Sequence, residues 1–186
     1  MRDALGPNRT VTLRPFGRGD FERLISWAPS EAALADWCGG FFRHPLDAAQ
    51  LGRYLDSAQD GNSRLIFTAC ADSGEPVGHV EISQIWPHLS SRLSRVLVAP
   101  SHRRRGIGTT MVGLAVSLSF DRHHVDRVDL GVSTGNVAAI SCYRGLGFEA
   151  VGIWRKAFVA GGRDMDVQWM TLRRAAWSTR MALAHV

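Results

Sequence analysis

Apolar and polar residues alternate in several short stretches of the chain and repeat with helical spacing in others. Alternation is typical of half-buried strands, and it predicts strands over residues 10–15, 64–71, 77–86, 94–98, 128–132, 148–159 and 164–172. Helical spacing predicts helices that begin at Asp20, Ser30, Asp47, Ile107 and Asn136. The order of these elements predicts an α+β fold built on one mixed sheet.

Length and composition favour one globular domain. The chain has 186 residues, of which 45% are hydrophobic, and this excludes an intrinsically disordered protein. No linker, repeat or low-complexity segment divides it, so we expect a single domain over residues 1–186. Its core would span residues 10–173, and its tail, residues 174–186, would be either a helix or a disordered end.

Charge and cysteine content indicate the setting in which the protein works. The net charge of +5 fits a protein that handles an anionic cofactor, and it also fits one that contacts nucleic acid. Cys38, Cys70 and Cys142 are odd in number and lack metal-ligand spacing, so we expect reduced thiols and no bound metal. No segment is apolar over the ~18 residues that a membrane span needs, and residues 1–10 lack an apolar signal core. We therefore expect a cytoplasmic protein with no membrane partner.

The most informative stretch runs from Ser94 to Phe120. Its strand is stopped by Pro100, and helical spacing starts at Ile107. Between strand and helix lie three arginines and two glycines: Arg103, Arg104, Arg105, Gly106 and Gly108. The unpaired N–H groups of a helix N-terminus attract an anion, and arginines add charge and paired donors for phosphate. We interpret the stretch as a pyrophosphate site, with an ordinary strand-to-helix loop carrying solvated arginines as the alternative.

Two nucleotide-binding motifs can be excluded at this loop. A P-loop requires lysine and then serine or threonine after its last glycine, whereas Gly108 is followed by Thr109 and Thr110. A dinucleotide fingerprint requires three glycines near the start of a βαβ unit, whereas two glycines lie here in the middle of the chain.

Two motifs resemble those of a known family. Arg103-x-x-Gly106-x-Gly108, preceded by Val96-Leu97-Val98-Ala99-Pro100, resembles the acyl-CoA signature of the GCN5-related N-acetyltransferases (GNAT). Further along, Asn136-x-x-Ala139-x-x-x-Tyr143-x-x-x-Gly147-Phe148 resembles the second motif of that family. The likeness covers nearly the whole chain. It is most similar to the RimJ/RimL type, which acetylates N-termini of ribosomal proteins and includes relatives with other acceptors.

The resemblance implies a twisted, mostly antiparallel sheet of about seven strands with flanking helices, in which strand 94–98 diverges from strand 127–133. Acetyl-CoA, the co-substrate, would lie between these two strands. Its pantetheine arm would pair with the backbone of Leu97 and Val98. Its pyrophosphate would bind the loop, where glycine permits close approach of the backbone to phosphate. The residues predicted for this contact are Arg103, Arg104, Arg105, Gly106, Ile107, Gly108 and Thr109.

A second pair of residues is predicted to contact the co-substrate. Asn136 and Tyr143 are two helical turns apart, so they share one face of the short helix that contains them. Asn136 would hydrogen-bond the pantetheine amide, and Tyr143 would reach the thioester sulfur as a catalytic residue. The alternative is structural, with Asn136 as a helix cap and Tyr143 as a core aromatic residue. Beside the glycine motif, we favour the co-substrate interpretation.

The reaction that the resemblance implies is direct attack of a primary amine on the acetyl carbonyl, with an N–H near Val98 stabilising the oxyanion. The ammonium group must first lose a proton. Glu81, in the middle of an apolar strand, is the candidate base, and a solvent-facing strand position is its alternative. The chain has Ser94-Arg95 where many relatives carry a glutamate. Two weaker candidates for the base are Asp164 and Asp166.

The acceptor amine is expected to enter on the side opposite the co-substrate, over residues 27–54 and the hairpin tip at 158–164. Phe41 and Phe42 are the predicted wall of this acceptor site, and a homodimer contact is their alternative. Five histidines lack metal-ligand spacing, and most of them are expected at the surface: His79, His88, His102, His123 and His124.

These observations together predict an acetyl-CoA-dependent N-acetyltransferase that acts on a protein N-terminus or a small-molecule amine. A non-catalytic acyl-CoA-binding module would keep the arginine motif without turnover, and Tyr143 argues against it. A nucleic-acid-binding protein would use the three consecutive arginines. Because this charge is compact and no exposed aromatic series accompanies it, no specific nucleic acid is expected as a partner.

Overall fold

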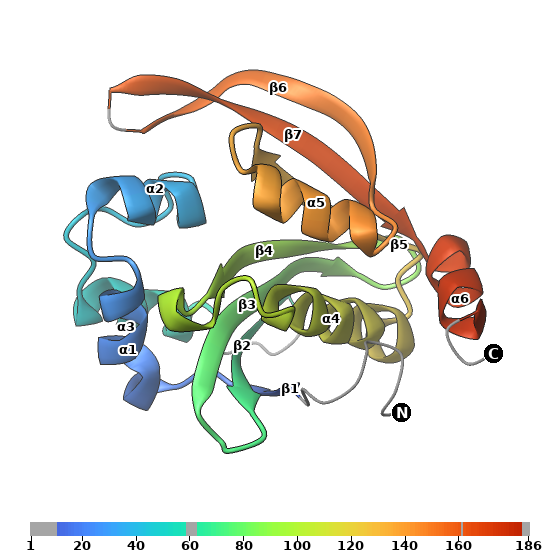
Figure 1. The fold of residues 1–186 in the computed structure, drawn as a ribbon, viewed down its shortest axis with the longest axis horizontal. Helices are drawn as coiled ribbons and strands as arrows, with labels where there is room; N and C mark the ends of the chain where they lie inside the picture. The colour runs from blue at the N-terminus through green and yellow to red at the C-terminus, as the bar shows by residue number, and fades with distance from the viewer. Residues whose placement is uncertain (1–10, 59–62, 161, 184–186) are drawn as a thin grey trace.

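The computed structural model describes residues 11–58, 63–160 and 162–183, and these form one sheet with helices on both faces (Figure 1). The strands are β1 (Val11–Pro15), β2 (Arg64–Ala71), β3 (Pro76–Trp86), β4 (Ser90–Val98), β5 (Arg127–Ser133), β6 (Glu149–Ala160) and β7 (Arg163–Arg173). Their order is β1-β2-β3-β4-β5-β7-β6, and every neighbouring pair is antiparallel except the parallel pair β4 and β5. The predicted mixed, mostly antiparallel sheet is confirmed.

Ser30 and Asp47 cap the helices that the sequence predicts to begin at them. The helices are α1 (Phe21–Trp27), α2 (Glu31–Cys38), α3 (Ala48–Asp56), α4 (Ile107–His123), α5 (Val137–Gly145) and α6 (Arg174–Leu183). The Ser30 side chain accepts a hydrogen bond from the Ala33 N–H at 3.2 Å, and the Asp47 carboxylate accepts one from the Gln50 N–H at 2.8 Å. Both bonds satisfy donors that have no partner inside the helix.

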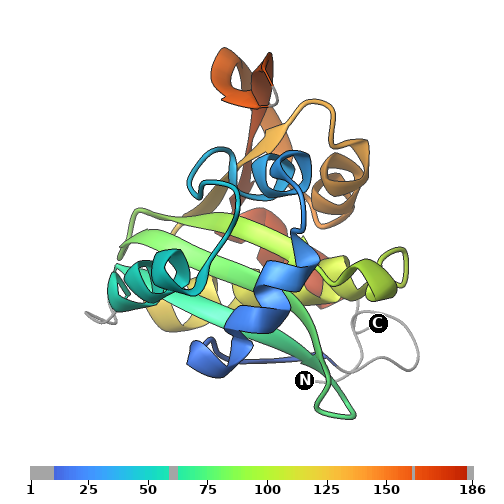
Figure 2. The ribbon, with the colours of Figure 1, turned by 90° about the vertical axis from the view of Figure 1, so that its left-hand side faces the viewer.

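Each face of the sheet carries its own apolar layer, and the views in Figures 1 and 2 show helices covering both faces. On one face, α4 packs through Ile107, Met111 and Ala115, whose spacing matches the predicted helical repeat. The second layer joins β2, β4 and Phe16, which follows β1, to α1, α2 and α3. Its fully buried members include Leu24, Leu34 and Leu51.

The β6–β7 hairpin crosses above α5 and extends toward α2 (Figure 1). Near the tip of this hairpin lies Phe158, and Gly39 is the C-cap of α2. A Cβ atom at Gly39 would lie 3.6 Å from Cε1 of the Phe158 ring. Strand β6 and helix α2, which are far apart in sequence, therefore lie side by side and enclose the space between them and β4.

Three predicted boundaries were wrong or left open. β4 begins at Ser90, before the predicted start at residue 94, because Ser90 and Ser91 are buried between β3 and β5. The helix that begins at Asp47 was predicted to end near Gly61-Asn62, but α3 ends at Asp56. The tail is a helix, α6, and its Trp177 joins the core. Predictions that fall on Thr10, Gly61, Asn62, Gly161 and residues 184–186 lie outside the described residues. Within the described ranges, no helix is long and apolar enough to cross a membrane.

Candidate active site

The two parallel strands at the centre of the sheet diverge after a short paired segment. β4 and β5 pair only through Ser90–Arg92 and Arg127–Asp129, although β4 continues to Val98 and β5 to Ser133. Beyond the pairing, residues of both strands line a cleft of about 1580 Å³. The divergence predicted between these two strands is confirmed, and it leaves one edge of β4 without a strand partner in the described part of the chain.

The N-terminus of α4 faces this cleft. Its N-cap, Gly106, has φ +78°, and Arg104 has φ +57°, so the loop makes a left-handed turn that glycine adopts without strain. A Cβ on Gly108 would lie 3.4 Å from Cγ2 of Val98, because the first helical turn packs closely on β4. The first N–H groups of a helix have no partner within it. These groups therefore supply hydrogen-bond donors beside the free edge of β4.

Most residues predicted to bind the co-substrate line the cleft. They are Leu97, Val98, Arg103, Arg104, Gly106, Gly108, Thr109, Asn136 and Tyr143. Arg103 is also tied to β4, since its Nε donates to the Val98 carbonyl at 3.3 Å. Arg105 and Ile107 are not among the residues that line the cleft. The Ile107 side chain is buried in the core beneath α4.

Helix α5 presents Asn136 and Tyr143 to the same cleft, as the two-turn spacing predicts. Asn136 is also the N-cap, because its side-chain oxygen accepts a hydrogen bond from the Ala139 N–H at 3.1 Å. Its amide NH₂ is not used in that cap. Tyr143 is buried against Phe148, with 5.8 Å between ring centres. Burial raises the pKa of Tyr143 above its usual value, so the phenol keeps its proton. No described residue accepts a hydrogen bond from its hydroxyl.

Glu81 lies in the middle of β3 as expected, but it is fully buried, so the solvent-facing alternative was wrong. Its carboxylate accepts hydrogen bonds from Tyr54 Oη at 2.6 Å and from Arg95 Nε and Nη2 at 2.5 Å each. Arg64 Nε lies 3.4 Å away. Glu81 is not among the residues that line the cleft. The geometry therefore favours a carboxylate that positions Arg95 over one that meets the substrate.

Arg95 reaches Glu81 because β4 is irregular at this point. The β3–β4 register shifts between His79 and Glu81, and Arg95 has φ +49°. At this bulge Arg95 lies on the side of the sheet that carries α1, α2 and α3, the side on which Leu97 also packs. The guanidinium also lies 3.9 Å from the centre of the Phe41 ring.

The two predicted acceptor-wall residues separate in the structure. Phe41 is half exposed and lines the cleft. Phe42 does not line the cleft, because it is buried against Trp37 at 5.6 Å between ring centres. The weaker base candidates lie elsewhere: Asp166 accepts a hydrogen bond from Arg155 at 2.7 Å, and Asp164 pairs with Lys156 at 2.9 Å.

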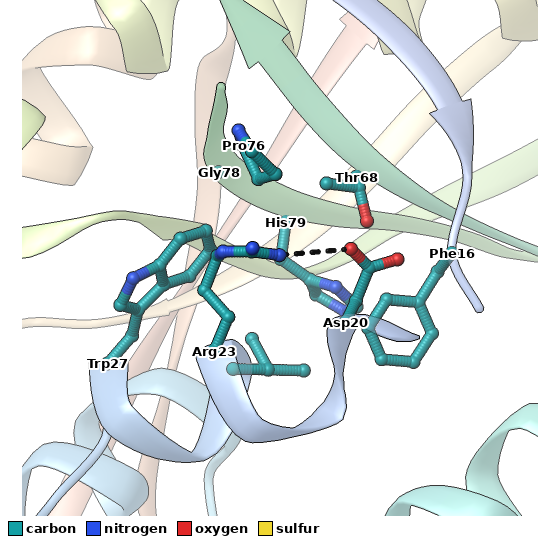
Figure 3. A pocket seen from close by; sticks show the side chains of 9 residues that line it. Phe16, Asp20, Arg23, Trp27, Thr68, Pro76, Gly78 and His79 are labelled. Carbon is teal, nitrogen blue, oxygen red and sulfur yellow. Dashed lines mark hydrogen bonds and ion pairs between the residues drawn. The ribbon is translucent and has the colours of Figure 1, made fainter. Parts of the chain in front are cut away.

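A second, much smaller cavity lies beside His79, between α1 and the sheet (Figure 3). Its volume of about 10 Å³ is room for one water molecule, so it cannot hold an acceptor. His79 was expected at the surface but is fully buried; its Nε2 lies 3.2 Å from the Tyr54 hydroxyl. Burial and, secondarily, nearby Arg95 lower the pKa of His79 to about 3, so the ring is neutral.

Sequence reasoning missed the polar side of the cleft opposite the co-substrate loop. The structure adds Asp36, Arg64, Arg92, Arg95 and Trp169 to the cleft lining. The spacing of Arg92 and Arg95 on one strand was the available signal, but alternation would place them on opposite faces. The three cysteines are free thiols, and within the described ranges no group of three or more His, Cys, Asp or Glu residues could hold a metal ion.

Comparison with known proteins agrees with this geometry. The sequence model of the acetyltransferase (GNAT) family matches residues 30–148, more than half of the chain. The chain belongs to the GNAT acetyltransferase family. This GNAT enzyme is 33% identical over 156 residues to the N-alpha-acetyltransferase RimI of Mycobacterium tuberculosis, covering 83% of the chain and 88% of that relative. It is 28% identical over 159 residues to an aminoglycoside N(6')-acetyltransferase type 1 of Klebsiella pneumoniae, covering 78% of the chain and 77% of the relative.

A solved structure shows the same fold as this GNAT enzyme. The spermidine N-acetyltransferase from Vibrio cholerae, in complex with CoA and spermine, matches with a TM-score of 0.80 at 24% sequence identity. The match covers 90% of this chain and 98% of the other. The predicted enzyme class, an acyltransferase, is thus confirmed at the level of the family.

Proposed function

We propose that this GNAT enzyme transfers the acetyl group of acetyl-CoA to a primary amine, on a small molecule or at a protein N-terminus as in the RimJ/RimL type. The observation that carries the proposal is the meeting of three features in one cleft: the edge of β4 beyond its pairing with β5, the N-terminus of α4, and the hydroxyl of Tyr143, which has no partner among the described residues. The relatives named above act on three kinds of acceptor, yet each acceptor supplies an amine.

Each wall of the cleft has a role in binding acetyl-CoA. The N–H groups at the start of α4 bind the pyrophosphate, with Arg103 and Arg104 as charged neighbours. The free edge of β4 at Leu97 and Val98 pairs with the pantetheine arm. The NH₂ group of Asn136 extends that pairing from the α5 side.

The transfer itself is a direct displacement. The amine nitrogen attacks the acetyl carbonyl carbon and releases its proton to water in the open cleft. The carbon–sulfur bond then breaks, and the Tyr143 hydroxyl donates a proton to the departing sulfur and regains one from water in the cleft. A thiol in water has a pKa of about 8.5, so this donation accelerates the step without being indispensable. Glu81 holds Arg95 in place through the bonds described above.

A thiol-release assay with acetyl-CoA tests this proposal. Ribosomal-protein N-terminal peptides, polyamines, aminoglycosides and amino acids are supplied as acceptors, and mass spectrometry locates the acetyl group. Release of CoA with one acetylated amine per thiol supports the proposal. Binding of acetyl-CoA without amine-dependent release would instead identify a non-catalytic acyl-CoA-binding module. Homodimer formation and a cytoplasmic location stay predictions.

A further inference from the structure

The side of the cleft that faces α2 and the β6–β7 hairpin is rich in arginine. Arg64, Arg92 and Arg95 all line it. Arg95 and Arg64 share the Glu81 carboxylate, at 2.5 Å and 3.4 Å. The carboxylate that lines the cleft among the described residues is Asp36, on α2. Positive charge therefore dominates the surface that an acceptor meets.

Arg92 differs from the other two because its charge is not neutralised by a contact. No described residue makes a hydrogen bond or an ion pair with its guanidinium, which lies 4.4 Å from the centre of the Trp169 ring. Asp129, its neighbour across the β4–β5 pairing, is occupied by Arg127 at 2.9 Å and by Thr171 at 2.7 Å. Burial and repulsion from Arg95 lower the pKa of Arg92. An anion beside Arg92 would stabilise its buried charge and offset the repulsion from Arg95.

Two aromatic residues of this side are already covered by the protein's own cations. Arg95 covers Phe41 at 3.9 Å, and Arg92 covers Trp169 at 4.4 Å. A polycationic acceptor is normally held by carboxylates and open aromatic faces. Here two aromatic faces are occupied, while Trp154 and Phe158 of β6 stay open. The three guanidinium groups repel a polycation, so the charge of this side of the cleft disfavours it.

We propose that this cleft selects an amine acceptor that also carries a carboxylate or phosphate group, and that Arg92 binds this anionic group. The proposal rests on the acetyl transfer proposed above. The Arg92 guanidinium lies over the Trp169 ring, 4.4 Å from its centre. A guanidinium presents two parallel N–H donors, which match the two oxygens of a carboxylate or phosphate. Arg95 is held in place by Glu81 and Phe41. Its positive charge adds attraction for the anionic group while its hydrogen bonds to Glu81 stay intact.

Matched acceptors test the proposal, because they differ only in the charge at the end away from the amine. The pairs are 4-aminobutyrate with putrescine, 6-aminohexanoate with 1,6-diaminohexane, and O-phosphoethanolamine with ethanolamine. Several lengths are needed, since Arg92 and Arg95 are three residues, or about 10 Å, apart along β4. The third pair separates a preference for phosphate from one for carboxylate. kcat and KM are measured for each member with saturating acetyl-CoA.

We expect at least one anionic member to exceed its partner in kcat/KM by roughly tenfold to a hundredfold, the range of a hydrogen-bonded charge contact. Arg92→Gln should reduce that ratio to near one, mainly by raising KM for the anionic member. Arg53→Gln, on the exposed side of α3, removes the same charge outside the cleft and should leave the ratio unchanged. Equal or better turnover of the diamines, or a ratio that survives in Arg92→Gln, would overturn the proposal.

Binding measurements distinguish a failure of the anion site at Arg92 from a failure of the proposed acetyl transfer. The complex with CoA is titrated with 6-aminohexanoate and with O-phosphoethanolamine by isothermal calorimetry, in the wild type and in Arg92→Gln. If no acceptor is acetylated but anion binding depends on Arg92, the proposed function fails and the anion site stands. If amines are acetylated but no anionic compound binds through Arg92, the anion site fails alone.

Discussion

The guanidinium of Arg95 donates two hydrogen bonds to the Glu81 carboxylate, one to each oxygen at 2.5 Å. The pair is buried on the face of the sheet that carries α1, α2 and α3, beneath the half-exposed Phe41 ring. Because Arg95 lines the cleft and Glu81 does not, we expect the carboxylate to act on the substrate only through the arginine.

Glu81→Gln should destabilise the fold by about 3 kcal/mol, because it leaves a buried guanidinium without its counter-charge. The measurement is urea unfolding at pH 7. Glu75→Gln is the control, since the exposed Glu75 carboxylate lies 3.7 Å from His102 and its loss should cost less than about 0.5 kcal/mol. Equal stability of the two variants would contradict the structural importance of the Glu81–Arg95 pair.

The pH–rate profile of Glu81→Gln distinguishes a positioning residue from a base. We expect kcat/KM to fall by the same factor from pH 6 to pH 9, because the loss reflects a displaced Arg95. A base would behave otherwise: its loss would matter most at low pH, where little free amine exists, and would be rescued toward the amine's own pKa. A loss confined to low pH would therefore restore Glu81 as the base.

Tyr143→Phe should lower kcat by roughly 10²- to 10⁴-fold, the usual contribution of a general acid. The ring keeps its packing on Phe148, so the affinity for acetyl-CoA should stay nearly constant. Steady-state kinetics give kcat, and calorimetric titration with acetyl-CoA gives the affinity. Full kcat in this variant would return Tyr143 to a purely structural role.

Gly108→Leu should abolish the stabilisation that acetyl-CoA gives to the fold. That stabilisation is about 2.7 kcal/mol at a hundredfold excess over Kd, and it appears as a rise in Tm. A side chain at position 108 starts 3.4 Å from Cγ2 of Val98 and would extend into the part of the cleft proposed for the co-substrate. Gly145→Leu is the control, because nothing lies within 4 Å of its Cβ position at the end of α5. An unchanged Tm shift in Gly108→Leu would refute the pyrophosphate site.

His79 makes the stability of the fold depend on pH. Its pKa is about 3 in the folded protein and about 6.5 when unfolded, so between these values the unfolded chain binds more protons. Stability must therefore fall as the pH is lowered from 6.5 toward 3. Between pH 7 and pH 5 the loss from this group is about 2 kcal/mol.

Urea unfolding at pH 7 and pH 5 measures this dependence. His79→Gln should remove most of the pH-dependent loss, whereas His44→Gln, on an exposed loop, should keep it. The same slope in the wild type and in His79→Gln would mean that His79 is protonated in the folded state.

The sequence allowed the fold and half of the site to be predicted, for reasons visible in particular residues. Gly106 and Gly108 mark a strand-to-helix turn locally, and Asn136 and Tyr143 share a helix face by spacing alone. The acceptor side could not be predicted this way. Arg95 reaches Glu81 through a bulge with φ +49°, and alternation cannot reveal such a shift in register.

The sequence pattern also did not reveal which residues the helices bury. His79 alternates as a surface residue would, yet helices α1, α2 and α3 cover its face of the sheet. Phe42 lies next to the half-exposed Phe41 in sequence, yet it turns into the helical layer against Trp37. These outcomes depend on packing between segments far apart in the chain, and a local pattern carries no information on such contacts.

Two-substrate initial-velocity kinetics test the central claim, direct transfer within one cleft, most directly. Acetyl-CoA and the best amine acceptor are varied together while thiol release is followed. Direct attack requires both substrates in the cleft at once, so double-reciprocal plots should intersect, and no thiol should be released before the amine is added. Parallel lines with a burst of thiol in the absence of amine would show a covalent acetyl-enzyme and contradict the account.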